Sequence, residues 1–121
     1  MQISTPISDE LSRYLNLSAQ QLTLTARNMA NIDTPGYRTQ GLDFAAEMRR
    51  SLGSEPGTES QTNSQARVSD VDGLLVRPDG NNVSMDRESL VLAQAQLEFR
   101  TGVELLKREF TRISDAIHED K

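Results

Sequence analysis

The chain has no cysteine and no tryptophan, and it contains a single histidine. Without cysteine it can form neither disulfides nor thiol-based sites, and its redox compartment stays open. The one histidine, His118, lies close to the end of the chain, where termini commonly fray, so we expect a solvated tail residue. Acid–base and nucleophilic catalysis usually depend on histidine, cysteine or an isolated pocket carboxylate. These absences argue against an enzyme.

Large apolar side chains are also scarce. The 121 residues include two tyrosines and three phenylalanines, and the mean hydropathy is -0.55. Residues 1–121 have the length of one small domain, with a sizeable core only if most of the chain contributes to it. Association with other chains would supply burial that a single copy lacks.

Neither a basic cluster nor a long apolar run is present. Thirteen Lys and Arg residues against eighteen Asp and Glu residues give a net charge of -5, which disfavours nucleic acid as a partner. No stretch approaches the roughly 18 apolar residues of a membrane-spanning helix. Residues 1–10 lack the basic and apolar regions of a secretory signal peptide. We expect no membrane span and, if the protein leaves the cytoplasm, a route without a cleaved signal.

An apolar stripe with helical spacing runs through the N-terminal part of the chain. It predicts a helix over residues 8–31, roughly 35 Å long. Ser8 suits its N-cap, with Thr5-Pro6 as a rival start, and Asn31 suits a left-handed C-cap. The apolar positions are Leu11, Leu15, Ala19, Leu22, Ala26 and Met29.

A longer stripe in the C-terminal part repeats every seven residues. It predicts a helix over residues 84–118, roughly 50 Å long, with Ser84 as its N-cap. Because this helix is longer than the first, part of its stripe must face another chain or lie bare, and large bare patches are avoided. We therefore favour intermolecular packing over a closed monomeric bundle. The main positions are Met85, Leu92, Phe99, Leu106 and Ile113, with Val103, Phe110 and Ile117 alternating.

The turn and flexible middle segment, residues 32–83, differ in character from both helices. Residues 53–67 contain no Val, Ile, Leu, Met or aromatic residue, which predicts disorder or ordering by a partner. Residues 42–52 favour a short helical turn, and residues 68–77 a short strand or hairpin. The predicted fold is mainly α, with two long terminal helices that pair as an antiparallel coiled coil around a partly disordered middle.

Two Asp-Gly segments, residues 70–73 and 79–82, faintly resemble calcium loops. Neither has the full ligand spacing of such a loop, and turn chemistry accounts for both. We therefore expect no metal and no cofactor.

The two stripes are the candidate assembly interface. We expect the apolar residues of the first helix to pack on those of the second, with part of each stripe left for neighbouring subunits. The interface residues are Leu11, Leu15, Leu22, Met29, Leu92, Phe99, Val103, Leu106, Phe110, Ile113 and Ile117.

Residues 28–37 read Asn-Met-Ala-Asn-Ile-Asp-Thr-Pro-Gly-Tyr. This run closely resembles the N-terminal signature of the bacterial flagellar rod, hook and axial protein family, in which Asn-x-Ala-Asn closes a helix and Thr-Pro-Gly-Tyr turns the chain away. A type II turn after proline would give the glycine a positive φ. The signature residues are Asn28, Ala30, Asn31, Thr34, Pro35, Gly36 and Tyr37.

Residues 79–83, Asp-Gly-Asn-Asn-Val, followed by Glu88, resemble the opening of the C-terminal helix in flagellar basal-body rod proteins of the proximal rod type. Where such subunits often carry an asparagine and then a tyrosine four residues on, this chain has Ala95 and Phe99. The amide and the hydroxyl that such subunits could use for polar contacts are absent at these two positions. Phe99 keeps the apolar ring, so the packing role survives.

The resemblance implies a structural subunit of the bacterial flagellum basal body, in the proximal part of a periplasmic rod. Its partners would be other copies of itself, other rod proteins, and components of the basal-body ring and export apparatus. Export would use the flagellar type III system without a cleaved signal peptide. The alternatives are another rod protein of the axial family, which should lack the 79–83 segment, and a cytoplasmic helical adaptor or secretion chaperone.

Overall fold

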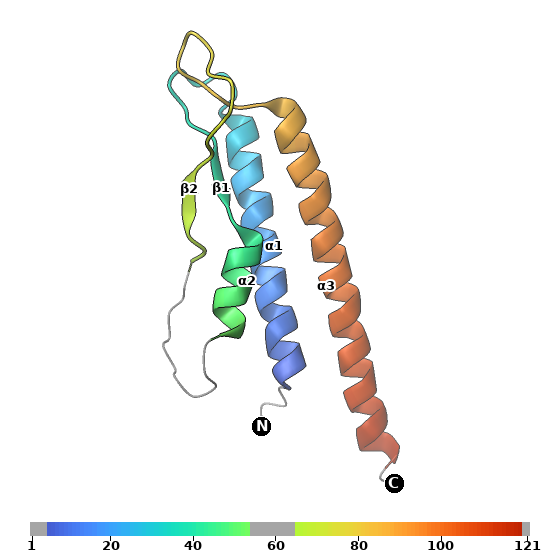
Figure 1. Cartoon of the computed structure of the whole chain (residues 1–121). Coiled ribbons are helices and arrows are strands. Elements are labelled where there is room, and N and C mark those ends of the chain that lie inside the picture. Colours follow the sequence, from blue (N-terminus) through green and yellow to red (C-terminus); the bar gives the residue numbers. More distant parts are fainter. Residues whose placement is uncertain (1–4, 54–64, 120–121) are drawn as a thin grey trace.

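The computed structural model describes residues 5–53 and 65–119, which form three helices and two short strands (Figure 1). The two long helices lie side by side and run in opposite directions, while the sheet and the short helix pack beside the first of them. The mainly helical fold with an antiparallel terminal pair is confirmed. In chain order the elements are α1 (Pro6–Ala30), β1 (Gln40–Leu42), α2 (Phe44–Leu52), β2 (Val68–Asp70) and α3 (Met85–Glu119).

Helix α1 begins at Thr5-Pro6, the alternative to the predicted cap at Ser8. The Thr5 hydroxyl accepts a hydrogen bond from the Ser8 N–H at 3.1 Å, and the Ser8 hydroxyl accepts one from the Thr5 N–H at 2.9 Å. This reciprocal capping box, with Pro6 at the first helical position, outcompetes a cap at Ser8. Asn31 is the C-cap as predicted, but its φ of -103° shows that the expected left-handed conformation was wrong.

The other two helices begin at capping side chains as well. The Ser84 hydroxyl accepts a hydrogen bond from the Arg87 N–H at 3.3 Å, which confirms Ser84 as the cap of α3. Asp43 caps α2 through the Ala46 N–H at 3.0 Å, and arginines occupy its last turn, where the helix dipole favours cations.

The polar segment 53–67 is described only at its two ends. The disorder prediction for residues 53–67 falls largely on 54–64, outside the described residues. At its edges Gly53 caps α2, and Ala66 is buried with its N–H donated to the Gln20 side chain at 3.0 Å.

The predicted strand region forms a shorter strand than expected. Only Val68–Asp70 is strand, and it pairs antiparallel with β1, with Gly41 opposite Ser69. The apolar centre of the prediction, residues 74–76, is loop instead. Gly73, with a φ of 78°, lies in a bend after the strand, and only glycine adopts such a backbone without strain.

The seam between α1 and α3 is built from small and polar residues. The buried residues of α3 recur every seven positions, as a heptad seam requires, but they are Glu88, Ala95, Gly102 and Glu109. We expected apolar residues of the second stripe to pack on the first helix, with part of each stripe left for neighbouring subunits. Phe110 was expected to contact the first helix, but its side chain is 53% exposed.

Gly102 explains why small residues suit the seam. A Cβ placed on Gly102 would lie 2.9 Å from the Leu15 Cδ2 atom and 2.9 Å from the Tyr14 ring. Tyr14 in turn packs edge-on against Phe44, with ring centroids 5.3 Å apart, which ties α2 to the same region. The close approach of the two long helices therefore depends on the absence of a side chain at position 102.

Replacing Gly102 with valine should destabilise the chain by about 1–3 kcal/mol, because the added atoms overpack a closed contact. Thermal unfolding followed by circular dichroism measures the change. Thr101→Val is the matched control: it introduces the same residue at the adjacent, exposed position, where we expect a change within about 0.5 kcal/mol. Equal midpoints for the two variants would contradict the packing at Gly102.

Candidate functional site

The two sequence motifs, residues 28–37 and 79–83, lie against each other at one end of the helix pair. The Gly36 N–H donates to the Asp79 carbonyl oxygen at 2.9 Å. A Cβ on Gly80 would lie 3.4 Å from the Gly36 Cα, so the two glycines pass close together. We call this region, with the start of α3, the junction.

The Thr-Pro-Gly-Tyr segment adopts the turn that its composition predicts. Gly36 has a φ of 74°, and the Tyr37 N–H donates to the Thr34 carbonyl oxygen at 3.2 Å. A positive φ after Pro35 is the requirement of a type II turn, and glycine meets it without steric cost. The expectation of a positive φ at Gly36 is confirmed.

Asn81 attaches the second motif to the first. Its side-chain amide donates to the carbonyl oxygens of Asn31 and Thr34, both at 2.9 Å, and its side-chain oxygen accepts from the Val83 N–H at 2.8 Å. The residue is fully buried. Because both donors and the acceptor are satisfied, this amide can close the end of α1 without a desolvation penalty.

Asn28 joins α1 to three other parts of the chain. Its side-chain NH₂ donates to the Gln40 carbonyl oxygen at 2.7 Å and to Glu88 Oε2 at 3.2 Å. Its side-chain oxygen accepts from the Tyr37 hydroxyl at 3.0 Å and from the Gln40 N–H at 3.2 Å. Two donors and two acceptor positions are the full capacity of an amide, so every one is used.

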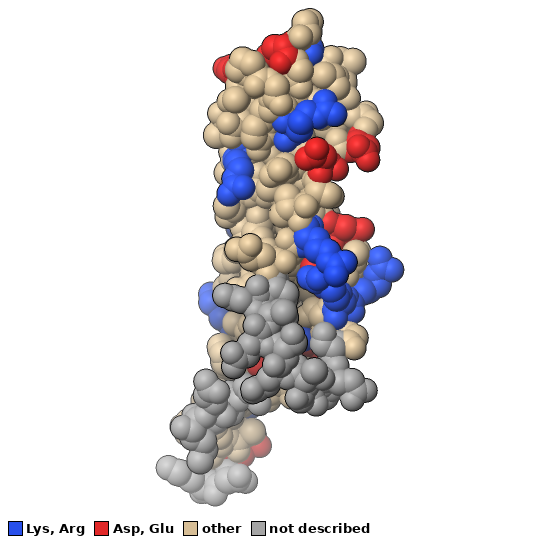
Figure 2. Space-filling model, turned by 90° about the vertical axis from the view of Figure 1, so that its left-hand side faces the viewer, with Lys and Arg blue, Asp and Glu red and all other residues tan. Residues whose placement is uncertain are grey.

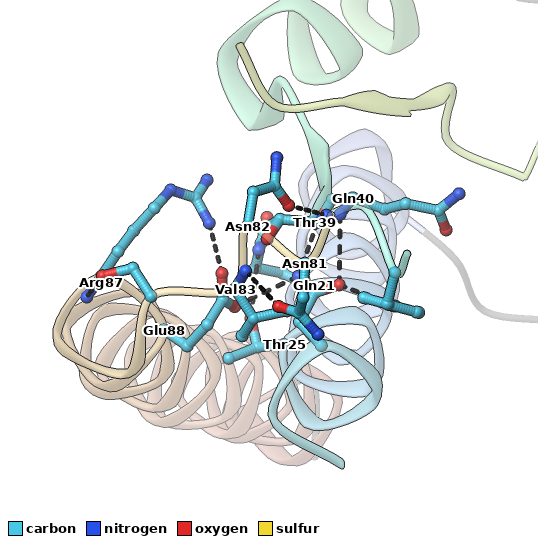
Figure 3. Close-up of polar contacts among 12 residues, drawn as sticks. Gln21, Thr25, Thr39, Gln40, Asn81, Asn82, Val83, Arg87 and Glu88 are labelled. Carbon is cyan, nitrogen blue, oxygen red and sulfur yellow. Dashed lines mark hydrogen bonds and ion pairs between the residues drawn. The ribbon is translucent and has the colours of Figure 1, made fainter. Parts of the chain in front are cut away.

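Glu88 is a carboxylate with no exposed surface. It accepts from Asn28 through one oxygen and from the Arg87 guanidinium through the other, at 2.5 Å. A buried carboxylate is costly unless it is paired and hydrogen-bonded, and here both oxygens have partners. Figure 3 shows Glu88 directed from the start of α3 toward the polar groups around Gln40.

The Tyr37 hydroxyl titrates above the ordinary range. Burial raises the pKa of Tyr37, the Arg27 charge opposes this shift, and the Glu88 charge adds to it. The phenol is therefore protonated at neutral pH, which is the form that can donate to Asn28.

The junction accounts for most of the family signature. Asn28, Asn31, Thr34, Gly36 and Tyr37 all make the contacts described above, and the Thr34 hydroxyl also donates to the Asn31 side-chain oxygen at 3.0 Å. The remaining two residues, Ala30 and Pro35, are exposed.

Sequence reasoning missed the role of Asn81, Asn82 and Glu88. The Asn82 side-chain oxygen accepts from the Thr39 N–H at 2.6 Å, deep inside the junction. The sequence marks the Asp-Gly-Asn-Asn run as a turn and as part of a family resemblance, but it does not assign its asparagines buried side-chain hydrogen bonds. The available signal was that two consecutive asparagines precede a helix with acidic residues in its first turn. A turn alone does not require this many polar side chains.

The predicted assembly residues lie along the helix pair rather than in the junction. Those of α1, together with Leu92, Val103, Leu106 and Ile113, are partly buried, whereas Phe99, Phe110 and Ile117 are exposed. Near its C-terminal end α3 carries a shallow apolar depression of about 280 Å³, lined by Phe110, Ile113, Ser114, Ile117 and His118.

The surface charge is mixed. On the face drawn in Figure 2, basic and acidic side chains alternate with wide uncharged areas. Among residues 5–53 and 65–119, no helix is long and apolar enough to span a membrane, and no three potential metal ligands come together. The hydrogen bonds of the junction hold the segments of this chain together. The exposed apolar residues of α3 form a surface that could contact another chain.

Replacing Asn28 with aspartate should destabilise the chain by about 2–4 kcal/mol, because two donors are lost and a second carboxylate faces Glu88. Chemical unfolding measures the loss. Asn16→Asp, at an exposed position of the same helix, should change stability by less than about 0.5 kcal/mol. Adding Glu88→Gln to the Asn28→Asp chain should recover part of the loss by restoring a donor; no recovery would contradict the contact.

Raising the pH should ionise Tyr37 later in the folded chain than in the denatured chain, whose tyrosines titrate near the ordinary 10.0. The Tyr14→Phe variant leaves Tyr37 as the one tyrosine, so ultraviolet absorbance of tyrosinate reports it alone. Because the folded pKa is raised, its contribution to stability is complete below the unfolded pKa and is lost as the pH rises through the folded pKa. A folded midpoint at or below the denatured one would refute this environment.

Similar proteins were found among curated sequences, although no protein-family model matches the chain. The chain is 36% identical over 108 residues to "Flagellar basal body rod protein FlgB" of Salmonella typhimurium, covering 76% of this chain and 78% of that protein. It is 30% identical over 112 residues to the FlgB of Escherichia coli, with coverage of 76% and 78%. The FlgB of Cereibacter sphaeroides is 33% identical over 118 residues, with coverage of 88% and 89%.

These relatives share most of their length with this chain, and all of them are named as rod proteins. The chain belongs to the FlgB family of flagellar basal body rod proteins and is a structural, non-enzymatic subunit of the rod.

Proposed function

We propose that this rod subunit polymerises through apolar residues of its terminal helices that its own fold leaves uncovered. The observation that supports the proposal is the composition of the α1–α3 seam. The fully enclosed positions of α3 are Glu88, Ala95, Gly102 and Glu109, so several of its large apolar residues remain exposed and available to other chains. Phe110, more than half exposed, is one of them, together with Leu90 and Leu97.

The size of the core favours the same proposal. Among the described residues, the buried apolar side chains are two leucines, a valine and two alanines. Burying one further Leu, Ile or Phe contributes about 1.5–3 kcal/mol, so a few interface residues would match a large part of the stability of a small domain. Assembly is therefore the main source of additional apolar burial for this subunit.

The proposed partners are other copies of this chain, other flagellar rod proteins, and components of the basal-body ring and the export apparatus. The names of the relatives, which are basal body rod proteins, support a position in the proximal rod. We place this rod in the periplasm, reached through the flagellar type III system. Neither alternative raised from the sequence, another axial-family protein or a helical adaptor, has an observation in its favour.

Replacing Phe110 with aspartate should abolish rod assembly and swimming in a strain that lacks this subunit, while leaving its synthesis intact. The side chain is exposed in the single chain, so the substitution removes an intermolecular contact and not a core residue. Swimming in soft agar and mass spectrometry of purified basal bodies measure the effect.

Thr111→Asp is the matched control, because the adjacent residue is an exposed α3 position with a polar side chain. It should retain most of the swimming and remain in the basal bodies. Full motility of the Phe110→Asp strain would count against the interface. Absence of the unaltered chain from purified basal bodies would overturn the proposed location itself.

A further inference from the structure

Helix α3 has a row of exposed side chains on the side that points away from α1. Leu90 and Leu97 are 70% and 67% exposed, although α3 buries Glu88 and Ala95 two positions earlier. Two positions correspond to about 200° around an α-helix, so the row lies almost opposite the seam. Large apolar residues repeated along an exposed helix side favour contact with another helix. We call this row the outer face of α3; it includes Asp86, Leu90, Ala93, Leu97, Glu104 and Arg108.

Helix α1 has a free side as well. α3 covers one side of α1, and β1 and α2 cover another (Figure 1). The residues that remain recur every three or four positions, all of them are exposed, and none is a large apolar residue. Such a surface leaves room for large side chains of an opposing helix. We call it the free face of α1; it consists of Ser12, Asn16, Ala19, Thr23 and Ala26, with Asp9 and Arg27 at its two ends.

The charges at the ends of these two faces are complementary when the helices run antiparallel. Each face has an aspartate near its start, Asp9 or Asp86, and an arginine near its end, Arg27 or Arg108. An antiparallel pair brings opposite charges together at both ends, whereas a parallel pair brings like charges together. Within residues 5–53 and 65–119, none of these four charges has an ion-pair partner. The charges therefore favour the antiparallel orientation.

The same alignment places the exposed leucines on small residues. When the aspartate at the start of α1 is level with Arg108, Leu97 lies beside Ala19 and Leu90 lies beside Ala26. Both leucines would be removed from water by this contact, which is favourable in proportion to the apolar area that is covered. The apolar and the charged parts of the two faces thus indicate one register.

The remaining charge of the outer face, Glu104, also has a counterpart. Arg13 borders the free face and is level with Glu104 in this alignment. Its guanidinium donates to the Ser51 carbonyl oxygen at 2.9 Å and has further donors for a carboxylate. Within the chain, Glu104 pairs with Lys107 at 3.5 Å, and both side chains are exposed. Exposed pairs of this kind contribute little stability, so Glu104 can change partners readily.

We propose that the outer face of α3 docks antiparallel on the free face of α1 in a second copy of this chain. The proposal rests on the proposed function and names the surfaces that join the copies. Because each copy contributes two different surfaces, the contact continues from copy to copy and does not close a two-fold dimer. Phe110 follows Arg108 by two positions and so lies on another side of α3, which allows separate tests of the two interfaces.

Disulfide cross-linking tests the contact, because the chain has no cysteine of its own. Thr23→Cys combined with Ala93→Cys puts one cysteine on each face and keeps both leucines. In the proposed alignment these two positions are level with each other in neighbouring copies. Within one chain each precedes a buried residue, Thr25 or Ala95, by two positions, so the two cysteines point away from each other.

In oxidised basal bodies, we expect most of the chain with Thr23→Cys and Ala93→Cys to run as dimers and longer multimers on a non-reducing gel. Asn16→Cys with Ala93→Cys is the matched control. Asn16 is exposed on the same free face, about 10 Å further along α1, and this pair should give about tenfold fewer multimers. Chains that carry either cysteine of the test pair alone should remain monomeric.

Charge reversal tests the orientation. In the chain with both test cysteines, Arg108→Glu places two carboxylates opposite each other and should reduce the multimers about threefold. Adding Asp9→Arg restores a pair of opposite charges and should return the multimers to within about twofold of their original amount.

Multimers that form through Ala93→Cys alone would overturn the proposal in favour of a symmetric contact between two α3 helices. A chain with both test cysteines that mass spectrometry finds in basal bodies, but that stays monomeric, would overturn it and leave the rod assignment intact. So would an Arg108→Glu defect that Asp9→Arg does not repair. Absence of the unaltered chain from basal bodies would overturn the proposed location and this contact with it.

Discussion

The side-chain amide of Asn28 is the interaction on which the rest of the structure depends. It binds β1 through Gln40, the turn through Tyr37, and α3 through Glu88. These partners lie up to 60 positions away along the chain. Since the amide is buried and fully satisfied, removing any partner leaves an unpaired polar group, and the four segments therefore form as one unit.

The seam between the long helices follows from this anchoring. With Glu88 held beside Asn28, the heptad repeat carries Ala95, Gly102 and Glu109 onto the same side of α3. Some apolar residues of α3 border this row and are partly buried, whereas others, such as Phe110 and Ile117, remain exposed. A rod subunit gains from this division, because the contacts that fold one chain differ from those available to join several.

Local sequence patterns predicted the secondary structure well because their causes are local. Pro35 and Gly36 require the turn that is observed, and the heptad spacing of α3 reflects a helix of the expected length. The start of α1 was misplaced by one turn because two capping arrangements compete there. The extent of the short strand and the order of Ala66 depend on β1 and Gln20, so composition alone could not reveal them.

The sequence by itself determined the two terminal helices, the turn at Gly36 and the family, because propensity, spacing and motif are properties of neighbouring residues. Only the tertiary structure decided which face of α3 meets α1 and where the polar groups of the junction find partners. Periodicity shows that a stripe is apolar, but it cannot show what covers it. A buried Glu88 is stable only beside Asn28, and that proximity exists only once the chain has folded.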